Sequence, residues 1–191
     1  MRKIDEQKKR SIELAILEIT KEQGIQGLSF GKIAKRAQVS SGAPYVYFED
    51  KTDMLSRIYL QCKILFDVSL RQDIDKGKSM KERIFLSVSH FAQMYLEYPL
   101  EANFITEIRA NPKLISPEAK AKGNALASPL TDLYEEAVAK DCLVTTNLEF
   151  ITMQLFAPFI MLIMERSAED QTVSIKELNE IIEISVNSIL K

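Results

Sequence analysis

Apolar residues recur every three or four positions along most of this chain, which is the spacing of helices with one buried face. The first such stripe lies within residues 11–23 and comprises Ile12, Ala15, Ile16 and Ile19. No stretch alternates apolar and polar residues for long enough to indicate a strand. The pattern therefore predicts an all-α fold of about nine helices, without internal repeats.

Capping signals place the ends of several helices. Ser79 and Glu82 have the spacing of a capping box, in which each side chain accepts a hydrogen bond from the other residue's backbone N–H. Thr146 and Glu149, and then Ser174 and Glu177, repeat this spacing. The helices expected after residue 49 span about 50–72, 79–98, 100–110 and 117–140, followed by two that open at 146 and 174.

Residues 29–51 predict two short helices joined by a tight turn. Ser29 is placed to cap the first helix, whose apolar stripe comprises Phe30, Ile33, Ala34 and Ala37. The second helix is expected over about Ser41–Phe48, with Ser40 or Ser41 as its cap. Two short helices joined by three or four residues form the helix-turn-helix arrangement of DNA-binding proteins. An ordinary helical hairpin within a bundle is the simpler alternative.

Ten residues of this region form a pattern: Ile33, Ala34, Ala37, Val39, Ser40, Gly42, Tyr45, Phe48, Lys51 and Leu55. The pattern resembles the signature of the TetR family of bacterial transcriptional regulators. Two positions depart from that signature, because Gln38 stands where glycine is usual and Pro44 stands where leucine is common. The rest of the chain is similar to the family only in its length and helical layout.

The resemblance implies that the second helix enters the major groove of DNA and that neighbouring residues hold phosphates. The residues expected to touch DNA are Ser29, Lys32, Ser40, Ser41, Gly42, Ala43, Tyr45, Val46, Tyr47 and Lys51. Tyr47 and Lys51 resemble the family's phosphate contacts, and Ala43 or Val46 is placed to meet a thymine methyl group. The expected partner is a palindromic operator in double-stranded DNA.

Charge is distributed unevenly, although the net charge is only −2. Residues 1–60 contain 11 Lys or Arg and 8 Asp or Glu, a net of +3, whereas residues 61–191 contain 14 and 19, a net of −5. A mildly basic N-terminal part suits a protein that touches DNA with one end. We expect a helix-turn-helix DNA-binding domain at residues 1–49 and a helical ligand-binding and dimerisation domain at residues 50–191.

Motifs that carry chemistry are scarce. The single histidine, His90, has no cysteine or carboxylate at ligand spacing, and the sequence contains no glycine-rich phosphate loop or nucleophile elbow. Cys62 and Cys142 lie far apart within helical patterns, which indicates reduced thiols rather than a disulfide or a metal cluster. We expect no catalytic residue, metal, cofactor or enzymatic activity; an active site assembled from distant residues is the alternative.

Large apolar side chains crowd the helices between about residues 79 and 170. Such residues are usually plain core, but TetR-family members typically bind an inducer among these helices. The residues expected to line a site for a small hydrophobic effector are Phe66, Phe91, Met94, Tyr95, Phe104, Ile108, Tyr134, Met153 and Phe156. Both signs of charge occur nearby, so the charge of a ligand stays open.

The last two expected helices carry more apolar surface than one small bundle buries. The residues expected at a homodimer interface are Phe159, Ile163, Ile175, Leu178, Ile182 and Ile189. Burial within a single subunit is the alternative. The apolar run from Phe150 to Met164 has 15 residues, which is short for a bilayer span, and the N-terminus does not resemble a signal peptide.

These features predict a cytoplasmic, dimeric DNA-binding transcriptional regulator, a repressor released from its operator by a small hydrophobic ligand. One alternative is a ligand-independent DNA-binding protein of the same fold. Another is a helical enzyme or binding module without a DNA role. The sequence leaves open the operator, the regulated genes, the effector, and whether transcription is repressed or activated.

Overall fold

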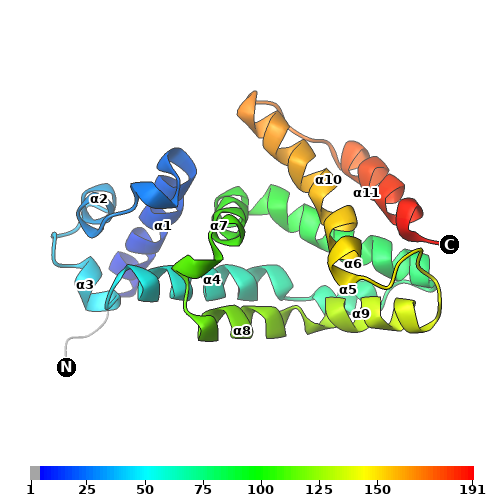
Figure 1. Ribbon diagram of the computed structural model, residues 1–191. Helices are drawn as coiled ribbons and strands as arrows, with labels where there is room; N and C mark the ends of the chain where they lie inside the picture. Colours follow the sequence, from blue (N-terminus) through cyan, green and yellow to red (C-terminus); the bar gives the residue numbers. More distant parts are fainter. Residues whose placement is uncertain (1–4) are drawn as a thin grey trace. The chain divides into compact units, whose positions relative to one another are not determined.

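The computed structural model describes residues 5–191 and confirms the all-α class (Figure 1). Eleven α-helices and two short 3-10 helices occur in this part of the chain, and no strand does. It divides into two compact units: the described residues up to Leu65 with Pro99–Ala125, and Phe66–Tyr98 with Leu126–Lys191. The functional boundary expected between residues 49 and 50 stays a prediction.

The first unit contains the expected helix-turn-helix. Apart from the last residue or two of α4 and α8, it holds α1 (Glu6–Gln23), η1 (Ile25–Gly27), α2 (Phe30–Arg36), α3 (Pro44–Tyr47), α4 (Lys51–Asp67), α7 (Pro99–Ala110), η2 (Pro112–Leu114) and α8 (Pro117–Leu126). Its core includes the buried side chains of Ile12, Ile16, Ile33 and Met54. The apolar stripes read from the sequence therefore meet behind the helix-turn-helix.

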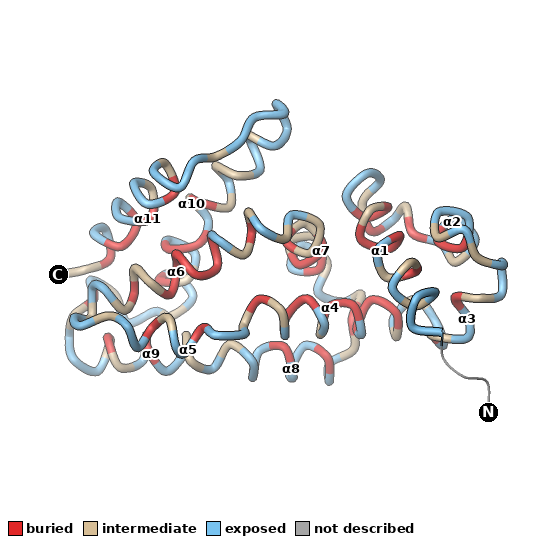
Figure 2. Tube along the Cα trace, turned by 180° about the vertical axis from the view of Figure 1, so that it is seen from behind, coloured by how far each residue is buried: buried red, intermediate tan, exposed pale blue. Residues whose placement is uncertain are grey.

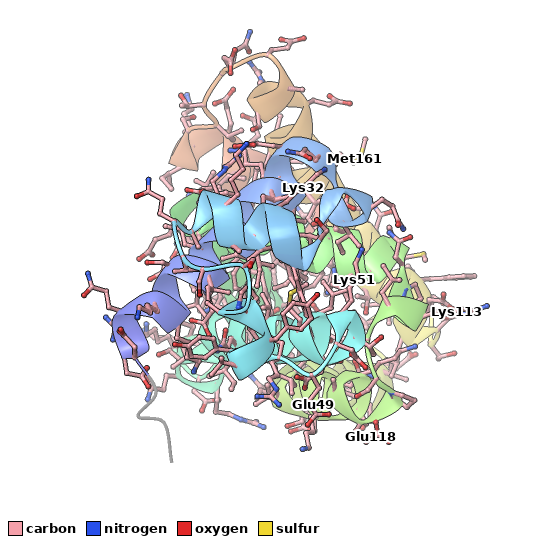
Figure 3. All side chains as sticks on the ribbon, turned by 90° about the vertical axis from the view of Figure 1, so that its left-hand side faces the viewer. Lys32, Glu49, Lys51, Lys113, Glu118 and Met161 are labelled. Carbon is pink, nitrogen blue, oxygen red and sulfur yellow. The ribbon has the colours of Figure 1, made fainter. Side chains whose placement is uncertain are left out.

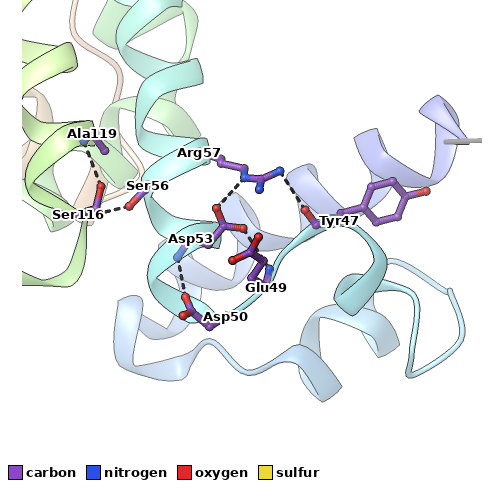
Figure 4. Close-up of polar contacts among 8 residues, drawn as sticks. All are labelled: Tyr47, Glu49, Asp50, Asp53, Ser56, Arg57, Ser116 and Ala119. Carbon is purple, nitrogen blue, oxygen red and sulfur yellow. Dashed lines mark hydrogen bonds and ion pairs between the residues drawn. The ribbon is translucent and has the colours of Figure 1, made fainter.

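Helices α4 and α8 approach each other closely within this unit. The backbone N–H of Ser116 donates to the Ser56 hydroxyl at 2.9 Å (Figure 4). Farther along α8, Gly123 is buried, and a Cβ added there would lie 2.5 Å from both Cε1 and the hydroxyl oxygen of Tyr59. Because real Cβ atoms do not approach so closely, this packing depends on the missing side chain.

The second unit holds α5 (Leu70–Ile74), α6 (Met80–Glu97), α9 (Ser128–Ala139), α10 (Leu148–Ala168) and α11 (Ile175–Ile189). Helix α11 packs against both α6 and α10. The capping box predicted at Thr146 and Glu149 is wrong, because Asn147 caps α10 by accepting from the backbone N–H groups of Glu149 and Phe150. The other two predicted boxes are present, that of Ser79 and Glu82 at the start of α6 and that of Ser174 and Glu177 at the start of α11. The sequence therefore placed the starts of these two helices correctly.

Two predicted helices are each broken in two. The helix expected over 50–72 stops at Asp67, because Ser69 has a φ of +64°, which a continuous right-handed helix does not contain. The helix expected over 117–140 divides into α8 and α9. Pro129 occupies the second position of α9, where its missing N–H costs no hydrogen bond, whereas it would interrupt a continuous helix.

The second helix of the helix-turn-helix is also shorter than predicted. Its N-cap is Ala43, which makes no side-chain cap, so the expectation that Ser40 or Ser41 caps this helix is wrong. The backbone N–H of Ala43 instead bonds to the carbonyl oxygen of Ser40 at 2.9 Å. A backbone turn therefore leads the chain into α3.

Helix α10 is apolar around its circumference but only partly buried (Figure 2). Its outer side exposes Phe150, Met153, Met161 and Met164, each by 49–60%. It is the one helix of the described residues that is long and apolar enough to cross a membrane, and 22% of its most apolar window is buried. Its 21 residues exceed the 15-residue run seen in the sequence, so length alone does not argue against a span.

Candidate DNA-binding site

The turn between α2 and α3 is built around Gln38, which has a φ of +55°. The N–H of Gln38 bonds to the carbonyl oxygen of Lys35 at 3.3 Å, and that of Val39 bonds to Ala34 at 3.0 Å. These two bonds make a Schellman motif, which places the residue after the helix C-cap in the left-handed region. Glycine adopts this backbone most readily, so Gln38 is strained there.

Gln38→Gly is expected to raise the free energy of unfolding by about 1 kcal/mol, because removal of the Cβ relieves the left-handed strain. Urea unfolding followed by circular dichroism measures the change. Gln93→Gly, at an exposed position inside α6, is the matched control and should lower stability by about 1 kcal/mol. Equal losses in both variants would show that the turn is not strained.

Helix α3 is fixed on its inner side and open on its outer side. Pro44 and Phe48 are buried. The Tyr45 ring meets Phe30 of α2 edge-on, with ring centroids 4.5 Å apart and an interplanar angle of 85°. Tyr45 and Val46 nevertheless remain 64% and 54% exposed. The arrangement presents these two side chains to solvent on an ordered helix.

A hydrogen-bonded network holds the junction of α3 and α4 (Figure 4). The Asp50 carboxylate caps α4 by accepting from the N–H of Asp53 at 2.8 Å. Asp53 accepts from Arg57 Nε at 2.7 Å, and Arg57 also donates to the carbonyl oxygen of Tyr47 at 3.2 Å. The Tyr47 hydroxyl donates to the backbone oxygen of Asp5 at 3.1 Å. Arg57 and Tyr47 therefore position α3 in addition to any contact they make with DNA.

An open groove of about 500 Å³ lies between α1 and α2 in the first unit. Its lining comprises Ile19, Gln23, Lys32, Lys35, Arg36 and Gln38. Arg36 is neutralised, because it donates to Glu22 at 2.9 Å and to Glu18 at 3.2 Å. The hydrogen bond from Arg36 lowers the pKa of Glu22, which keeps this pair charged. The positive potential of the groove therefore comes from its two lysines.

Those two lysines are differently placed. Lys32 lies on α2 (Figure 3). Its Nζ donates to the neutral Gln23 Oε1 at 2.8 Å and keeps its charge uncompensated. Lys35 is exposed and has no ion-pair partner within residues 5–191. Lys35 was not among the residues expected to touch DNA, although its position three residues after Lys32 puts it on the same side of α2. Both ammonium groups are available for phosphates.

Lys51 opens α4 and is half-buried (Figure 3). Its ammonium group donates to the carbonyl oxygens of Ile25 and Leu28 at 3.1 and 3.3 Å. It therefore ties the α1–α2 connection to α4, a role that the sequence did not reveal. An ammonium group has three donors, so one N–H remains for the phosphate contact that we predict.

Lys51→Ala is expected to lower the unfolding free energy by about 1 kcal/mol, because two carbonyl oxygens lose their donor. It should also weaken binding to all DNA sequences alike and lower the salt slope of binding by about one. Lys35→Ala is the matched control and should lower the slope by about one without changing stability. A changed operator preference with an intact slope would exclude Lys51 as a phosphate contact.

The predicted DNA contacts share the first unit, and most are exposed. Ser29, Lys32, Ser40, Ser41, Gly42, Tyr45 and Val46 are exposed, whereas Ala43, Tyr47 and Lys51 are half-buried. Ser29 also caps α2, as predicted, by accepting from the N–H of Lys32 at 3.3 Å. Their assignment to DNA contact stays a prediction.

The residues predicted to line an effector site fall in both units. Phe104 and Ile108 are buried in α7 of the first unit. In the second unit, successive ring centroids lie 5.3–5.7 Å apart along a chain of Phe66, Tyr95, Phe159, Phe156 and Phe91. The structure therefore brings together four of the predicted residues and adds Phe159 to them.

The other three predicted effector residues differ in burial. Tyr134 is buried, and its burial raises the pKa of its hydroxyl, which stays protonated at neutral pH. Met94 is half-buried, and Met153 is 58% exposed on α10. Met153 therefore faces away from the interior of its unit. The effector site as a whole remains a prediction.

Four of the six residues predicted at a dimer interface are buried inside the second unit: Phe159, Leu178, Ile182 and Ile189. Ile163 is half-buried, and Ile175 is 54% exposed. The strong apolar stripe of α11 packs within its own chain, which is the alternative noted from the sequence. The exposed apolar residues lie on the outer side of α10, with Ile184 of α11 exposed by 62%.

His90 is a core residue with partners that the sequence did not reveal. Its Nδ1 lies 2.7 Å from Asp73 Oδ2, and its Nε2 lies 2.8 Å from the carbonyl oxygen of Phe66. Cys62 is buried, which raises the pKa of its thiol, and Cys142 is half-buried. Among the residues that the structure describes, no group of three or more His, Cys, Asp or Glu is arranged to hold a metal ion.

Comparisons with known proteins point to the same region of the chain. The family model for bacterial regulatory proteins, tetR family, matches residues 14–58, which run from α1 into α4. The fatty acid metabolism regulator protein of Bacillus subtilis (strain 168) is 30% identical over 96 residues, 50% of each chain. The transposon Tn10 TetC protein of Escherichia coli is 33% identical over 84 residues, 43% of this chain and 39% of that one. The chain therefore matches half or less of these relatives' length.

Solved structures extend the likeness over nearly the whole chain. A TetR family transcription regulator from Marinobacter aquaeolei VT8 has a TM-score of 0.85 at 18% identity, with 100% of both chains covered. The transcriptional regulator FadR from Bacillus subtilis, in complex with stearoyl-CoA, has a TM-score of 0.69 at 21% identity, covering 95% of this chain and 99% of that one. At these identities the likeness establishes the fold.

Proposed function

We propose that this chain, which belongs to the TetR family of bacterial regulatory proteins, is a cytoplasmic, dimeric repressor that leaves its operator when a small hydrophobic ligand binds. The observation that carries the proposal is the α2–turn–α3 pair. Its inner side is anchored by Phe30 and Phe48, and its outer side presents Tyr45 and Val46 to solvent. A helix held in this way suits insertion into the major groove of DNA.

The exposed side of α10 supports a two-fold dimer. Phe150, Met161 and Met164 form part of an apolar surface that a single chain leaves in water. Pairing of two identical surfaces about a two-fold axis is the commonest way in which such a patch is buried. A symmetric dimer presents two copies of α3, which then address two half-sites of a palindromic operator one or more helical turns apart.

The aromatic chain in the second unit supports a hydrophobic effector. Rings from α6 and α10, including Phe91 and Phe156, contact each other in an apolar interior whose side chains a bound hydrophobic ligand would have to displace. A ligand shifts the equilibrium between two dimer geometries only by its differential affinity for them, typically ~1–3 kcal/mol. The solved FadR relative was complexed with stearoyl-CoA, so this compound is the first to test.

The proposal predicts reciprocal weakening between operator and effector. An operator is first selected from a library of random DNA duplexes by gel-shift binding to the full chain. Stearoyl-CoA is then titrated calorimetrically with and without this duplex, and the operator should weaken its binding by about 5–150-fold.

Three other outcomes would change the proposal. Failure to shift any duplex would refute the DNA-binding role and favour a helical binding module or enzyme. Equal ligand affinities in the two titrations would exclude stearoyl-CoA as the effector. If a panel of short- and long-chain acyl compounds also showed no coupling, the ligand-independent regulator of the same fold would be the better description.

A further inference from the structure

The segment that enters DNA in the proposed function carries no charged or amide side chain. Residues 40–48 contain only serine, glycine, alanine, proline, tyrosine, valine and phenylalanine. Proteins most often read guanine with arginine or lysine and adenine with asparagine or glutamine. None of these four residue types stands on α3, so the common hydrogen-bonded base contacts are not available from this helix.

Apart from the Tyr45 hydroxyl, the exposed surface of α3 is apolar. Val46 is 54% exposed, and Ala43 at the N-cap is half-buried, whereas Pro44 and Phe48 are turned into the core. In the major groove, the C5-methyl group of thymine is the group through which an apolar side chain recognises an A·T pair. Burial of a methyl group against a branched aliphatic side chain is favourable, because both surfaces leave water.

Tyr45 makes this surface rigid. Its ring is held edge-on against Phe30 while 64% of the residue remains exposed. A side chain already fixed in the free protein loses little conformational entropy on binding. Tyr45 therefore offers a fixed aromatic surface beside Val46. Together these two side chains suit contact with thymine methyl groups better than hydrogen bonding to the edge of a base pair.

The cations needed for affinity lie outside α3. Lys32 and Lys35 on α2 are available for phosphates, and Lys51 lies at the start of α4. Phosphate contacts position a protein on DNA without selecting sequence. Affinity and selectivity are therefore carried by different residues of this unit.

Resting on the proposed DNA-binding function, we infer that the operator half-site is read through thymine methyl groups, with Val46 as the specificity-determining contact and Tyr45 as its rigid neighbour. The half-site then contains A·T pairs beneath α3, with their thymine methyl groups turned toward Val46.

The test removes the methyl groups and leaves the base pairing intact. An operator selected from random duplexes is resynthesised with deoxyuridine in place of each half-site thymidine in turn. Loss of the methyl group that faces Val46 should weaken binding by about 4-fold when one half-site is altered and by about 16-fold when both are altered. Placing 5-methylcytosine for cytosine outside that position should have no effect.

Variants link the methyl group to the side chain. The Val46→Ala variant should bind the thymidine operator more weakly than the unaltered protein does. Its affinities for the deoxyuridine and thymidine operators should be equal. Lys35→Ala is the matched control and should weaken binding to both operators by the same factor, because its contact is with phosphate. Circular dichroism confirms that the exposed substitutions leave the helices intact.

Three results would overturn the inference. Equal affinity of the unaltered protein for the two operators would show that no methyl group is read. A selected half-site without thymidine beneath α3 would do the same, while leaving the DNA-binding function in place. Failure to bind any duplex would remove the proposed function itself, and the inference with it.

Discussion

Met161→Glu is expected to convert the dimer into a monomer and to lower operator affinity by about 10²–10⁴-fold. Met161 is 52% exposed on the outer side of α10, where the proposed partner covers it. A glutamate at this position would lose its hydration within an apolar contact, which is unfavourable. Because the interface is two-fold symmetric, the glutamates of both protomers would lose their hydration. A dimer that contacts two half-sites at once binds more tightly than a monomer that contacts one, by about this factor. The monomeric variant should lose that gain in affinity.

Light scattering and gel-shift titration measure the two parts of this prediction. Val144→Glu is the matched control, because Val144 is an equally exposed apolar residue that precedes α10. It should leave both the dimer and the operator affinity unchanged. If the unaltered protein were already a 22 kDa monomer at micromolar concentration, α10 would need another partner, and a lipid vesicle flotation assay would be the next measurement.

Gly123→Ala is expected to lower the free energy of unfolding by about 1–3 kcal/mol, the usual range for an overpacked core position. The new methyl group would lie 2.5 Å from the buried Tyr59 ring, so α8 or the ring has to move. Because α4 carries the helix-turn-helix on its first turn, we also expect weaker operator binding. Chemical unfolding of the purified variant measures the stability change.

Gly31→Ala supplies the control for this substitution. Gly31 lies inside α2, and nothing comes within 4 Å of a Cβ built there. Alanine favours the helix over glycine, so this variant should be more stable by up to about 1 kcal/mol. A loss of stability at Gly31, or none at Gly123, would contradict the packing seen in the first unit.

The sequence predicted the elements that depend on local signals. Ser29 caps α2, Asp50 caps α4, and the two capping boxes open α6 and α11, because each of these interactions spans only three residues. The break at Ser69 has no comparable signal, since neither glycine nor proline marks it. Pro129 does mark the second break, but the helix expected over 117–140 ran through it.

Contacts between residues far apart in the sequence could not be predicted. Hydrophobic spacing showed that Leu178 and Ile182 share an apolar stripe, but not that α6 and α10 of the same chain cover it. A lysine at the start of a helix indicated a phosphate contact, whereas the carbonyl oxygens of Ile25 and Leu28 lie more than twenty residues away in sequence. Contacts between distant segments require the fold.

The apolar outer side of α10 has a consequence for gene dosage. If only the paired form holds an operator, occupancy rises with the square of the subunit concentration whenever that concentration is below the dimer dissociation constant. A twofold fall in expression then lowers the paired form about fourfold, so control of a promoter is lost abruptly as the protein is diluted by cell growth. In the proposed dimer, the four exposed side chains Phe150, Met153, Met161 and Met164 would therefore set the concentration at which the protein begins to occupy its operator.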